Sequence, residues 1–342
     1  MTNNVQSLIS VCVGAERAQW LFNRLNVDAS VVRDDAQHVS RGEIAQALNM
    51  VLFADLLDRV PEGASYVADV EKRGQKITFD HGALRTVDAD CGELPRGYSA
   101  FARLLEPLGF FINGMYPLPR LKMTGRAFAH ADFPEQIAQF FVSELHVSEF
   151  SPAFRHAVTR VVGESRDPLK TESKRLLKKL GAQKYLSLIE AMQLLPNVIE
   201  CFGVQHNTIA RDDYEILLNE SAEMAWISTE GAAYNHVTDR VPDVFQLSDE
   251  QKAQGRSIKP TVEVSANGRV RQTAFKAAQV ERVMRNADGT QALYTVPGSF
   301  YEFITRDRFV DGNGIEQLDL TFDSSNATGI FKMTDAGVAK AA

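Results

Sequence analysis

The chain has 342 residues, of which 44% are hydrophobic and 24% are charged, and this ordinary globular mix argues against a disordered, collagen-like or coiled-coil protein. Its 37 basic and 44 acidic residues give a formal net charge of −7. That balance does not favour binding to nucleic acid or to an anionic membrane surface.

Residues 1–75 are expected to form an N-terminal helical region. Apolar residues recur at helical spacing over residues 15–26 and 43–60. In the longer segment this stripe consists of Ile44, Leu48, Val51, Leu52 and Leu56. Pro61 is expected to end that helix.

Residues 76–132 are expected to form a first β-rich half. Apolar and polar residues alternate around Ile77 and Phe79, which is typical of a strand. Residues 98–108 look helical, and residues 110–130 predict two strands around a proline-rich turn.

Residues 133–231 are expected to form a helical insertion, because five segments begin near Pro, Ser or Asp and then show helical spacing. These segments are FPEQIAQFFVSELH, SPAFRHAVTRVV, PLKTESKRLLKKL, AQKYLSLIEAMQLL and DDYEILLNESAEMAW. Residues 232–342 are expected to form a second β-rich half with a C-terminal segment, in which Asn267-Gly268 and Asp288-Gly289 predict hairpin turns. No linker separates these regions, so we expect one compact unit.

Familiar catalytic motifs are missing from the sequence. It contains no GxGxxG after a strand, no GxxxxGK[ST], no HExxH and no GxSxG, which argues against dinucleotide, P-loop, zincin and α/β-hydrolase chemistry. The candidate sites considered next are therefore built around the seven histidines.

The first candidate site combines His81, His236 and Glu302. Each β-rich half opens with a strand that bears one histidine, in FDHGALRTV and YNHVTDRV, and Glu302 lies in the apolar segment SFYEFITRD. A carboxylate in such a segment is costly unless it is paired or binds a metal. Two imidazoles and one carboxylate form the facial triad of non-haem Fe(II) enzymes. The alternative interpretation is that each histidine is a hydrogen-bonded structural residue.

Two further sets are weaker. His130 and Asp132 with His206 imitate another iron-binding pattern, with Arg211 as a carboxylate clamp, but Asp132 is also a good helix N-cap. His146 and Glu149 are three residues apart on an expected helix and are more simply a surface pair.

Arg85 follows His81 by four residues in one extended segment, so both side chains are expected on one face. A guanidinium in that place can bind a substrate carboxylate through two hydrogen bonds. An ordinary surface ion pair is the competing interpretation.

The segments FDHGALRTVD, YNHVTDRV, VRQTAFKA and SFYEFITRD resemble the 2-oxoadipate dioxygenase/decarboxylase family, also called hydroxyglutarate synthase. This family belongs to the vicinal oxygen chelate, or glyoxalase-like, group. The resemblance runs from about residue 40 to GIFKM, near residue 333. It implies an α+β fold in which a curved mixed β-sheet, built from two βαβββ-like halves, encloses a metal site.

The resemblance places the metal ligands on His81, His236 and Glu302 and the substrate-binding arginine on Arg85. It also places Ser325 and Asn326 at substrate-contact positions near the C-terminus. The implied cofactor is Fe(II), although another divalent metal can occupy such a site. The implied reaction converts a 2-oxo diacid such as 2-oxoadipate, with O2, to a 2-hydroxy acid such as 2-hydroxyglutarate and CO2. Phe300, Tyr301, Phe303 and Phe275 are candidates for an apolar wall.

Two other functions stay open from the residues alone. One is a glyoxalase-like lyase or isomerase that uses the same triad without O2, and the other is a non-catalytic binding or scaffold protein. We expect a cytoplasmic protein with small-molecule partners and neither nucleic acid nor membrane, because no signal peptide is evident and the three cysteines form no CxxC motif.

Overall fold

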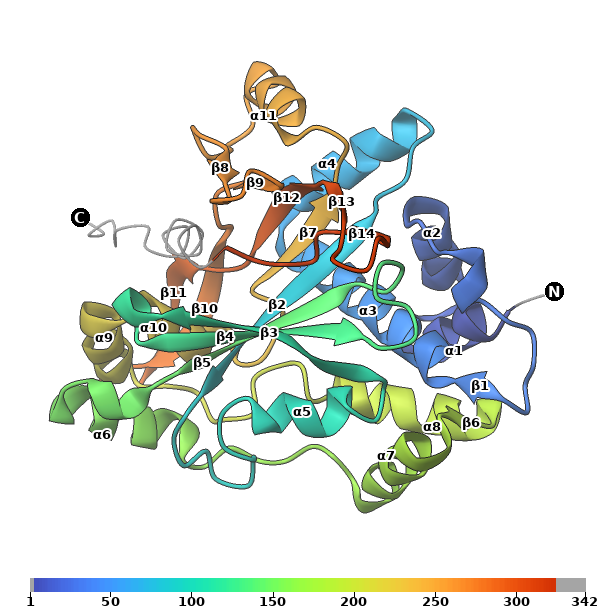
Figure 1. Ribbon diagram of the computed structural model, residues 1–342. Helices are drawn as coiled ribbons and strands as arrows, with labels where there is room; N and C mark the ends of the chain where they lie inside the picture. Colours follow the sequence, from blue (N-terminus) through green and yellow to red (C-terminus); the bar gives the residue numbers. More distant parts are fainter. Residues whose placement is uncertain (1–2, 324–342) are drawn as a thin grey trace.

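The computed structural model describes residues 3–323 (Figure 1). The N-terminal region contains these elements: α1 (Asn4–Val13), α2 (Ala15–Arg24), η1 (Ala29–Val31), β1 (Val39–Ser40), α3 (Arg41–Arg59) and α4 (Pro61–Lys72). The two predicted helices correspond to α2 and α3. Pro61 does end α3, but it also begins α4, because proline is favoured at the first position of a helix.

The first β-rich half follows as β2 (Phe79–Val87), α5 (Ser99–Leu105), β3 (Phe110–Leu118), η2 (Pro119–Leu121), β4 (Met123–His130) and β5 (Gln139–Leu145). The prediction of a helix over residues 133–146 is wrong, because Gln139–Leu145 form strand β5, in which every residue is buried. A strand covered on both faces has no polar alternation, so its short apolar run cannot be told from a buried helix by spacing.

The segment between β5 and β7 is mainly helical, as predicted, but Tyr185–Leu186 form a short strand instead of the start of a helix, and the predicted helix DDYEILLNESAEMAW is divided into two helices at Ser221. It comprises η3 (Val147–Glu149), α6 (Pro152–Val162), α7 (Thr171–Gln183), β6 (Tyr185–Leu186), α8 (Leu188–Ile199), α9 (Arg211–Glu220) and α10 (Ala222–Glu230). In Figure 1, α6, α9 and α10 lie at the opposite side of the central strands from α1 and α2.

The second half comprises β7 (His236–Arg240), α11 (Val244–Ala253), β8 (Glu263–Val264), β9 (Val270–Ala274), β10 (Gln279–Arg285), β11 (Gln291–Pro297), β12 (Phe300–Arg306), β13 (Arg308–Val310) and β14 (Glu316–Leu318). Helix α11 was not predicted, although Asp243 caps it by accepting from two backbone amides. The β8–β9 and β10–β11 hairpins confirm the predicted turns at Asn267-Gly268 and Asp288-Gly289.

An eight-stranded sheet with the order β3-β4-β5-β2-β7-β12-β9-β8 joins the two halves. In each half the first strand pairs in parallel with the last, as β2 with β5 and β7 with β12. The two first strands, β2 and β7, pair antiparallel at the centre. This topology confirms two βαβββ units, the second carrying the β10–β11 hairpin as an addition, in a sheet that curls into a half-barrel. In the described part of the chain, no helix has the length and apolar character needed to cross a membrane.

One face of the second half packs on α4 through aromatic side chains. Tyr66 of α4 contacts the rings of Phe275, Tyr301 and Phe303 at centroid distances of 4.8 to 6.2 Å. The expectation that these three residues line the site is therefore wrong. Strand alternation turns Tyr301 and Phe303 to the face opposite Glu302.

Candidate metal centre

Strand register brings the three predicted ligands to one face of the sheet. Thr238 of β7 lies opposite His81 of β2 and also opposite Glu302 of β12. Side chains directly opposite one another lie on the same face of a sheet, so His81, Thr238 and Glu302 share one face. His236 lies on this face too, because it precedes Thr238 by two residues in the same strand. Three strands that are far apart in sequence thus converge on one point, as the first candidate set required.

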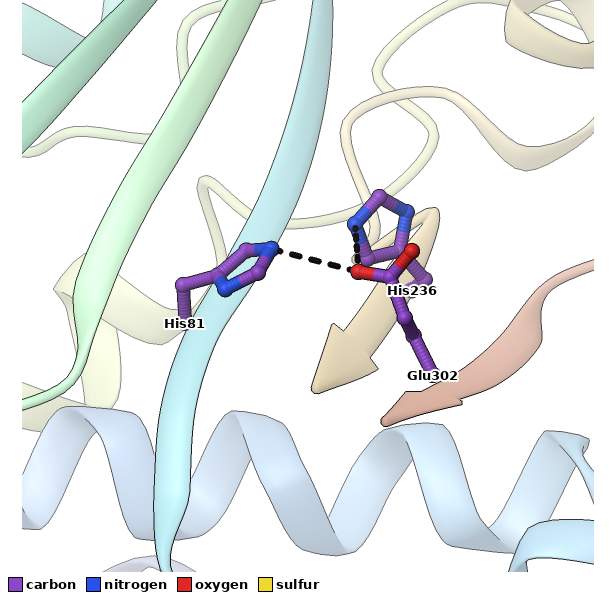
Figure 2. Close-up of side chains that lie close together, drawn as sticks. All are labelled: His81, His236 and Glu302. Carbon is purple, nitrogen blue, oxygen red and sulfur yellow. Dashed lines mark ion pairs between the residues drawn. The ribbon is translucent and has the colours of Figure 1, made fainter. Parts of the chain in front are cut away.

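The ligand atoms of these residues lie close together (Figure 2). Glu302 Oε2 is 3.4 Å from His81 Nε2 and 3.5 Å from His236 Nε2. The side chains of all three residues are at most 5% exposed. Metal–nitrogen and metal–oxygen bonds of about 2.0–2.2 Å place two ligands of one ion roughly 3–4 Å apart, so the spacing fits a shared cation.

A β-bulge sets the orientation of His81. The register between β2 and β7 shifts between Phe79 and His81, which leaves Asp80 as the extra residue. Consecutive strand residues normally point to opposite faces, but a bulge re-aims one of them. His81 Nδ1 therefore donates to Asp80 Oδ1 at 2.9 Å, and this bond leaves the Nε2 lone pair facing the site.

His236 is oriented in the same way by the residue before it. Its Nδ1 lies 3.3 Å from Oδ1 of Asn235. Thr238 completes the arrangement because its hydroxyl donates to Glu302 Oε2 at 2.7 Å. Hydrogen bonds from neighbouring side chains to metal-binding groups fix their geometry and their protonation.

The electrostatics favour an anionic carboxylate beside a neutral imidazole. Burial opposes ionisation of Glu302, but the neighbouring histidines and Thr238 outweigh it and lower its pKa to about 2. Burial lowers the pKa of His236 to about 3, against the opposing charge of Glu302. Burial also disfavours protonated His81, yet the hydrogen bonds that it donates to Asp80 and Glu302 raise its pKa. A bound cation would displace that proton.

A metal ion fits these residues. Glu302 Oε1 is buried and finds no hydrogen-bond partner among residues 3–323, which is costly unless another group completes it. In the same part of the chain, His81, His236 and Glu302 are the one group of three or more such side chains whose ligand atoms all lie within 4.8 Å of one another. Two nitrogens and one carboxylate suit Fe(II), Zn, Mn or Ni, so the donor set defines a divalent site without choosing the element.

Arg85 lies on the same face of β2 as His81 and is 2% exposed. Its guanidinium carbon lies 5.2 Å from the ring centre of Trp226. Burial lowers the pKa of Arg85 to about 10, and the charge of Glu223 opposes this shift, so the side chain is cationic at neutral pH. Arg85 is therefore a buried residue, and the expectation that it lies on the surface is wrong.

The structure does not assemble the other histidine sets. His130 Nε2 donates to the carbonyl of Leu108, and Asp132 pairs with Arg41 at 2.7 Å instead of capping a helix. His206 bonds to the carbonyl of Asn207, while Arg211 pairs with Glu215.

His146 lies outside any α-helix, so the prediction that it shares a helix face with Glu149 is wrong. It comes just before the short turn η3, and its Nε2 is 2.9 Å from the hydroxyl of Thr124.

Four residues near the site were not predicted: Asn235, Thr238, Arg306 and Phe322. The same strand spacing that singled out Arg85 after His81 also links Arg306 to Glu302, four residues earlier, so this signal was available. Ser325 and Asn326 lie outside the described residues, and their substrate role stays a prediction.

Two βαβββ halves in one curved sheet, with a His-His-Glu group on its face, define a glyoxalase-like protein with a candidate metal centre. The model of the 2-oxoadipate dioxygenase/decarboxylase family matches residues 43–334, and the chain belongs to this family. Among curated proteins, none matches this chain significantly.

Solved structures agree with this assignment. A glyoxalase superfamily protein from Ralstonia eutropha JMP134 is 52% identical, with a TM-score of 0.90, over 94% of this chain and 98% of that one. Hydroxyglutarate synthase from Oryza sativa, in complex with 2-oxoadipate, is 18% identical with a TM-score of 0.65, over 89% and 96%. The Pseudomonas putida enzyme, also with 2-oxoadipate, is 18% identical with a TM-score of 0.54, over 88% and 70%. The last two likenesses show a shared fold.

Proposed function

We propose that this protein is an Fe(II)-dependent dioxygenase/decarboxylase that converts a 2-oxo diacid of the 2-oxoadipate type, with O2, to a 2-hydroxy acid of the 2-hydroxyglutarate type and CO2. The atoms balance: the acid loses CO2 and gains both oxygen atoms, one in the new carboxylate and one in the new hydroxyl. The observation that carries the proposal is the convergence of His81, His236 and Glu302, with the buried Glu302 Oε1 left for a cation.

Each side chain has a definite task in this proposal. His81, His236 and Glu302 hold the metal, which when bound supplies a Lewis acid and a one-electron reductant for O2. Asp80 and Asn235 hold the two imidazoles in the tautomer that presents Nε2. Arg85 binds the distal carboxylate of the diacid, and this contact orients the substrate and discriminates against acids that lack that charge.

Oxygen uptake and CO2 release by the purified, Fe(II)-loaded protein with 2-oxoadipate test the reaction. Replacing a metal ligand, as in His81→Ala or Glu302→Gln, should abolish both activity and metal retention after dialysis. His38→Ala is a matched control, because the side chain of His38 is 59% exposed and bonds to Asp35. Conversion of a thiol hemiacetal without O2 uptake would favour the lyase or isomerase instead. Undiminished metal content in both ligand variants would contradict the metal centre itself.

Substitution of Arg85 tests the substrate assignment. Arg85→Ala should lower kcat/KM for 2-oxoadipate about 100-fold, because a charge-assisted contact is lost, while metal content stays unchanged. The control substrate is 2-oxohexanoate, which has the same carbon chain without the distal carboxylate and should lose little. Equal kcat/KM for 2-oxoadipate in the variant and the wild type would show that Arg85 does not bind the substrate.

A further inference from the structure

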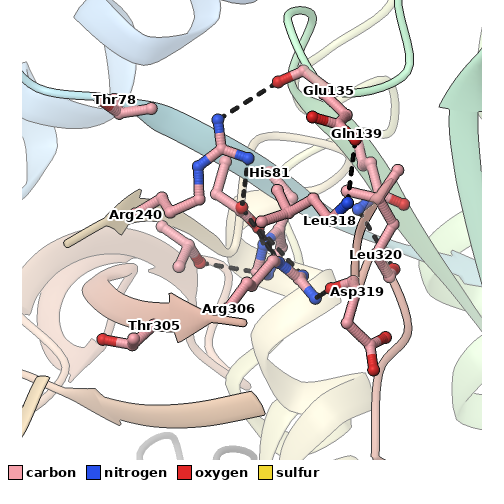
Figure 3. A network of polar contacts seen from close by, with 12 residues as sticks. Thr78, His81, Glu135, Gln139, Arg240, Thr305, Arg306, Leu318, Asp319 and Leu320 are labelled. Carbon is pink, nitrogen blue, oxygen red and sulfur yellow. Dashed lines mark hydrogen bonds and ion pairs between the residues drawn. The ribbon is translucent and has the colours of Figure 1, made fainter. Parts of the chain in front are cut away.

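The segment that follows β14, residues 319–322, crosses the metal-bearing face and is called here the closing segment. Arg306 Nη1 donates to the carbonyls of Asp319 and Thr321 at 2.9 and 2.7 Å. From the first half, Gln139 donates to the carbonyl of Leu320 at 3.4 Å, and the Tyr116 hydroxyl accepts from the Phe322 amide at 3.1 Å. Both halves of the sheet thus hold this segment (Figure 3).

These contacts place the ring of Phe322 beside a metal ligand. Its centroid is 4.8 Å from that of His81, with the two rings perpendicular. It is also 4.8 Å from the ring of Phe141 and 5.8 Å from that of Tyr116. Phe322 therefore forms an apolar wall beside His81, together with Phe141 and Tyr116.

One buried guanidinium joins this wall to the metal centre. The Nε and Nη2 atoms of Arg306 donate to Asp80 at 3.0 to 3.1 Å, and the two side chains are 0% and 1% exposed. Asp80 in turn accepts from His81. The planar, five-donor fork of arginine can serve Asp80 and two carbonyls at once, which the single ammonium of lysine cannot do in the same geometry.

We propose that Phe322 is a specificity-determining residue that limits the chain length of the oxo acid bound beside His81, and that Arg306 is the positioning residue that places it. This inference rests on the proposed function, because it needs a 2-oxo acid at the metal. A pocket wall of this kind discriminates one added methylene by roughly 10- to 200-fold.

Binding measurements that do not require turnover test the role of Phe322. The Co²⁺-loaded protein is titrated without O2 with 2-oxoadipate and with its seven-carbon homologue 2-oxopimelate, and the Co²⁺ absorption bands report binding. Phe322→Ala should shift the ratio of the two Kd values at least about 10-fold toward the longer acid. Phe322→Leu should shift it less. The control is Phe309→Ala, which should leave the ratio of the two Kd values unchanged. Phe309 is a half-buried phenylalanine stacked on Arg269.

Hydrogen exchange tests the role of Arg306. The backbone amides of residues 319–322 should exchange at least 10-fold faster in Arg306→Lys and Arg306→Gln than in the wild type. Arg271→Gln is the matched control, because Arg271 hydrogen-bonds to Asp307 and to the carbonyl of Gly268 and not to residues 319–322. The lysine variant keeps the charge opposite Asp80, so it remains informative if the glutamine variant does not fold.

The outcomes separate the two proposals. A wild type that binds 2-oxoadipate, with an unchanged Kd ratio in Phe322→Ala, would overturn the role of Phe322 alone. Wild-type exchange rates in Arg306→Lys would overturn the role of Arg306. A wild type that binds Co²⁺ but neither acid would overturn the proposed function and the Phe322 assignment together, while the exchange experiment would still decide whether Arg306 positions the segment.

Discussion

The two halves of the sheet correspond residue by residue, because the antiparallel pairing of β2 with β7 places a local two-fold axis between them. Ala83 lies opposite His236, and His81 lies opposite Thr238. An axis placed through the Gly82–Val237 pair makes His81 the counterpart of His236. Each histidine bonds through Nδ1 to the residue before it, Asp80 in the first half and Asn235 in the second. The same backbone position carries a charge in one half and a neutral amide in the other.

That difference contributes to opposite pKa shifts of the two histidines. Burial acts to lower the pKa of both histidines, but the hydrogen bonds and charges of Asp80 and Glu302 together raise the pKa of His81. Asn235 is neutral, and the pKa of His236 falls to about 3. One half therefore supplies a histidine stabilised as a cation in the metal-free site, and the other supplies a neutral imidazole.

A second difference decides the number of ligands. Glu302 pairs with Thr238 in the second half, and the corresponding pairing in the first half joins Phe141 to Ala83. Phe141 is thus the counterpart of Glu302. Four ligands would follow from exact repetition of the halves. With three protein ligands, a bound divalent metal would keep coordination positions free for other groups.

Asp80→Asn would make the first half resemble the second, and it should have the largest effect. It leaves the buried guanidinium of Arg306 without its carboxylate partner, and breaking such a pair costs about 3–5 kcal/mol. Metal affinity should also fall about 10- to 100-fold. Urea unfolding and metal titration measure the two effects. The control is Asp307→Asn, which removes the partly exposed partner of Arg271. Equal stability of Asp80→Asn and the wild type would contradict a structural role for this ion pair.

The strand that carries His236 also contains a buried carboxyl on its other face. Asp239 is the counterpart of the fully buried Leu84, and it accepts from the Tyr66 hydroxyl and the Thr78 amide, both at 2.9 Å. Burial raises the pKa of Asp239 to about 7, against these two hydrogen bonds. The unfolded carboxyl titrates near pH 4, about 3 units lower. Between these values the folded chain holds a proton that the unfolded chain has released, so stability falls as pH rises.

Asp239→Asn should remove this pH dependence. Wild-type stability should decrease by about 2–4 kcal/mol from pH 4 to pH 8 relative to the variant, since each pKa unit corresponds to about 1.4 kcal/mol. Denaturant unfolding at several pH values measures the difference between the two curves. Parallel curves would show that Asp239 titrates alike in both states.

The sequence predicts more of the site than of the elements that build it. Alternation and family resemblance both selected His81, His236 and Glu302, because a carboxylate in an apolar strand needs a partner. Spacing could not show that Gln139–Leu145 is a strand, since burial on both faces hides the alternation. The bulge at Asp80 was equally hidden, because register depends on the pairing of β2 with β7. Phe322 reaches His81 only through the closing segment, and no local pattern encodes that contact.

Thr238→Ala should have the smallest effect of these substitutions. It gives the second half the alanine that the first half has at the corresponding position, Ala83. The variant loses the 2.7 Å hydrogen bond from Thr238 to Glu302, and a bond to a charged group contributes about 1.5–3 kcal/mol. We expect the free energy of unfolding to fall by about 1–2 kcal/mol and metal affinity to fall about tenfold. Thr238→Ser keeps the hydroxyl and should restore most of both. If alanine and serine weaken metal binding equally, the hydroxyl does not orient Glu302, and the methyl group of Thr238 packed against the sheet would be the feature that the second half needs.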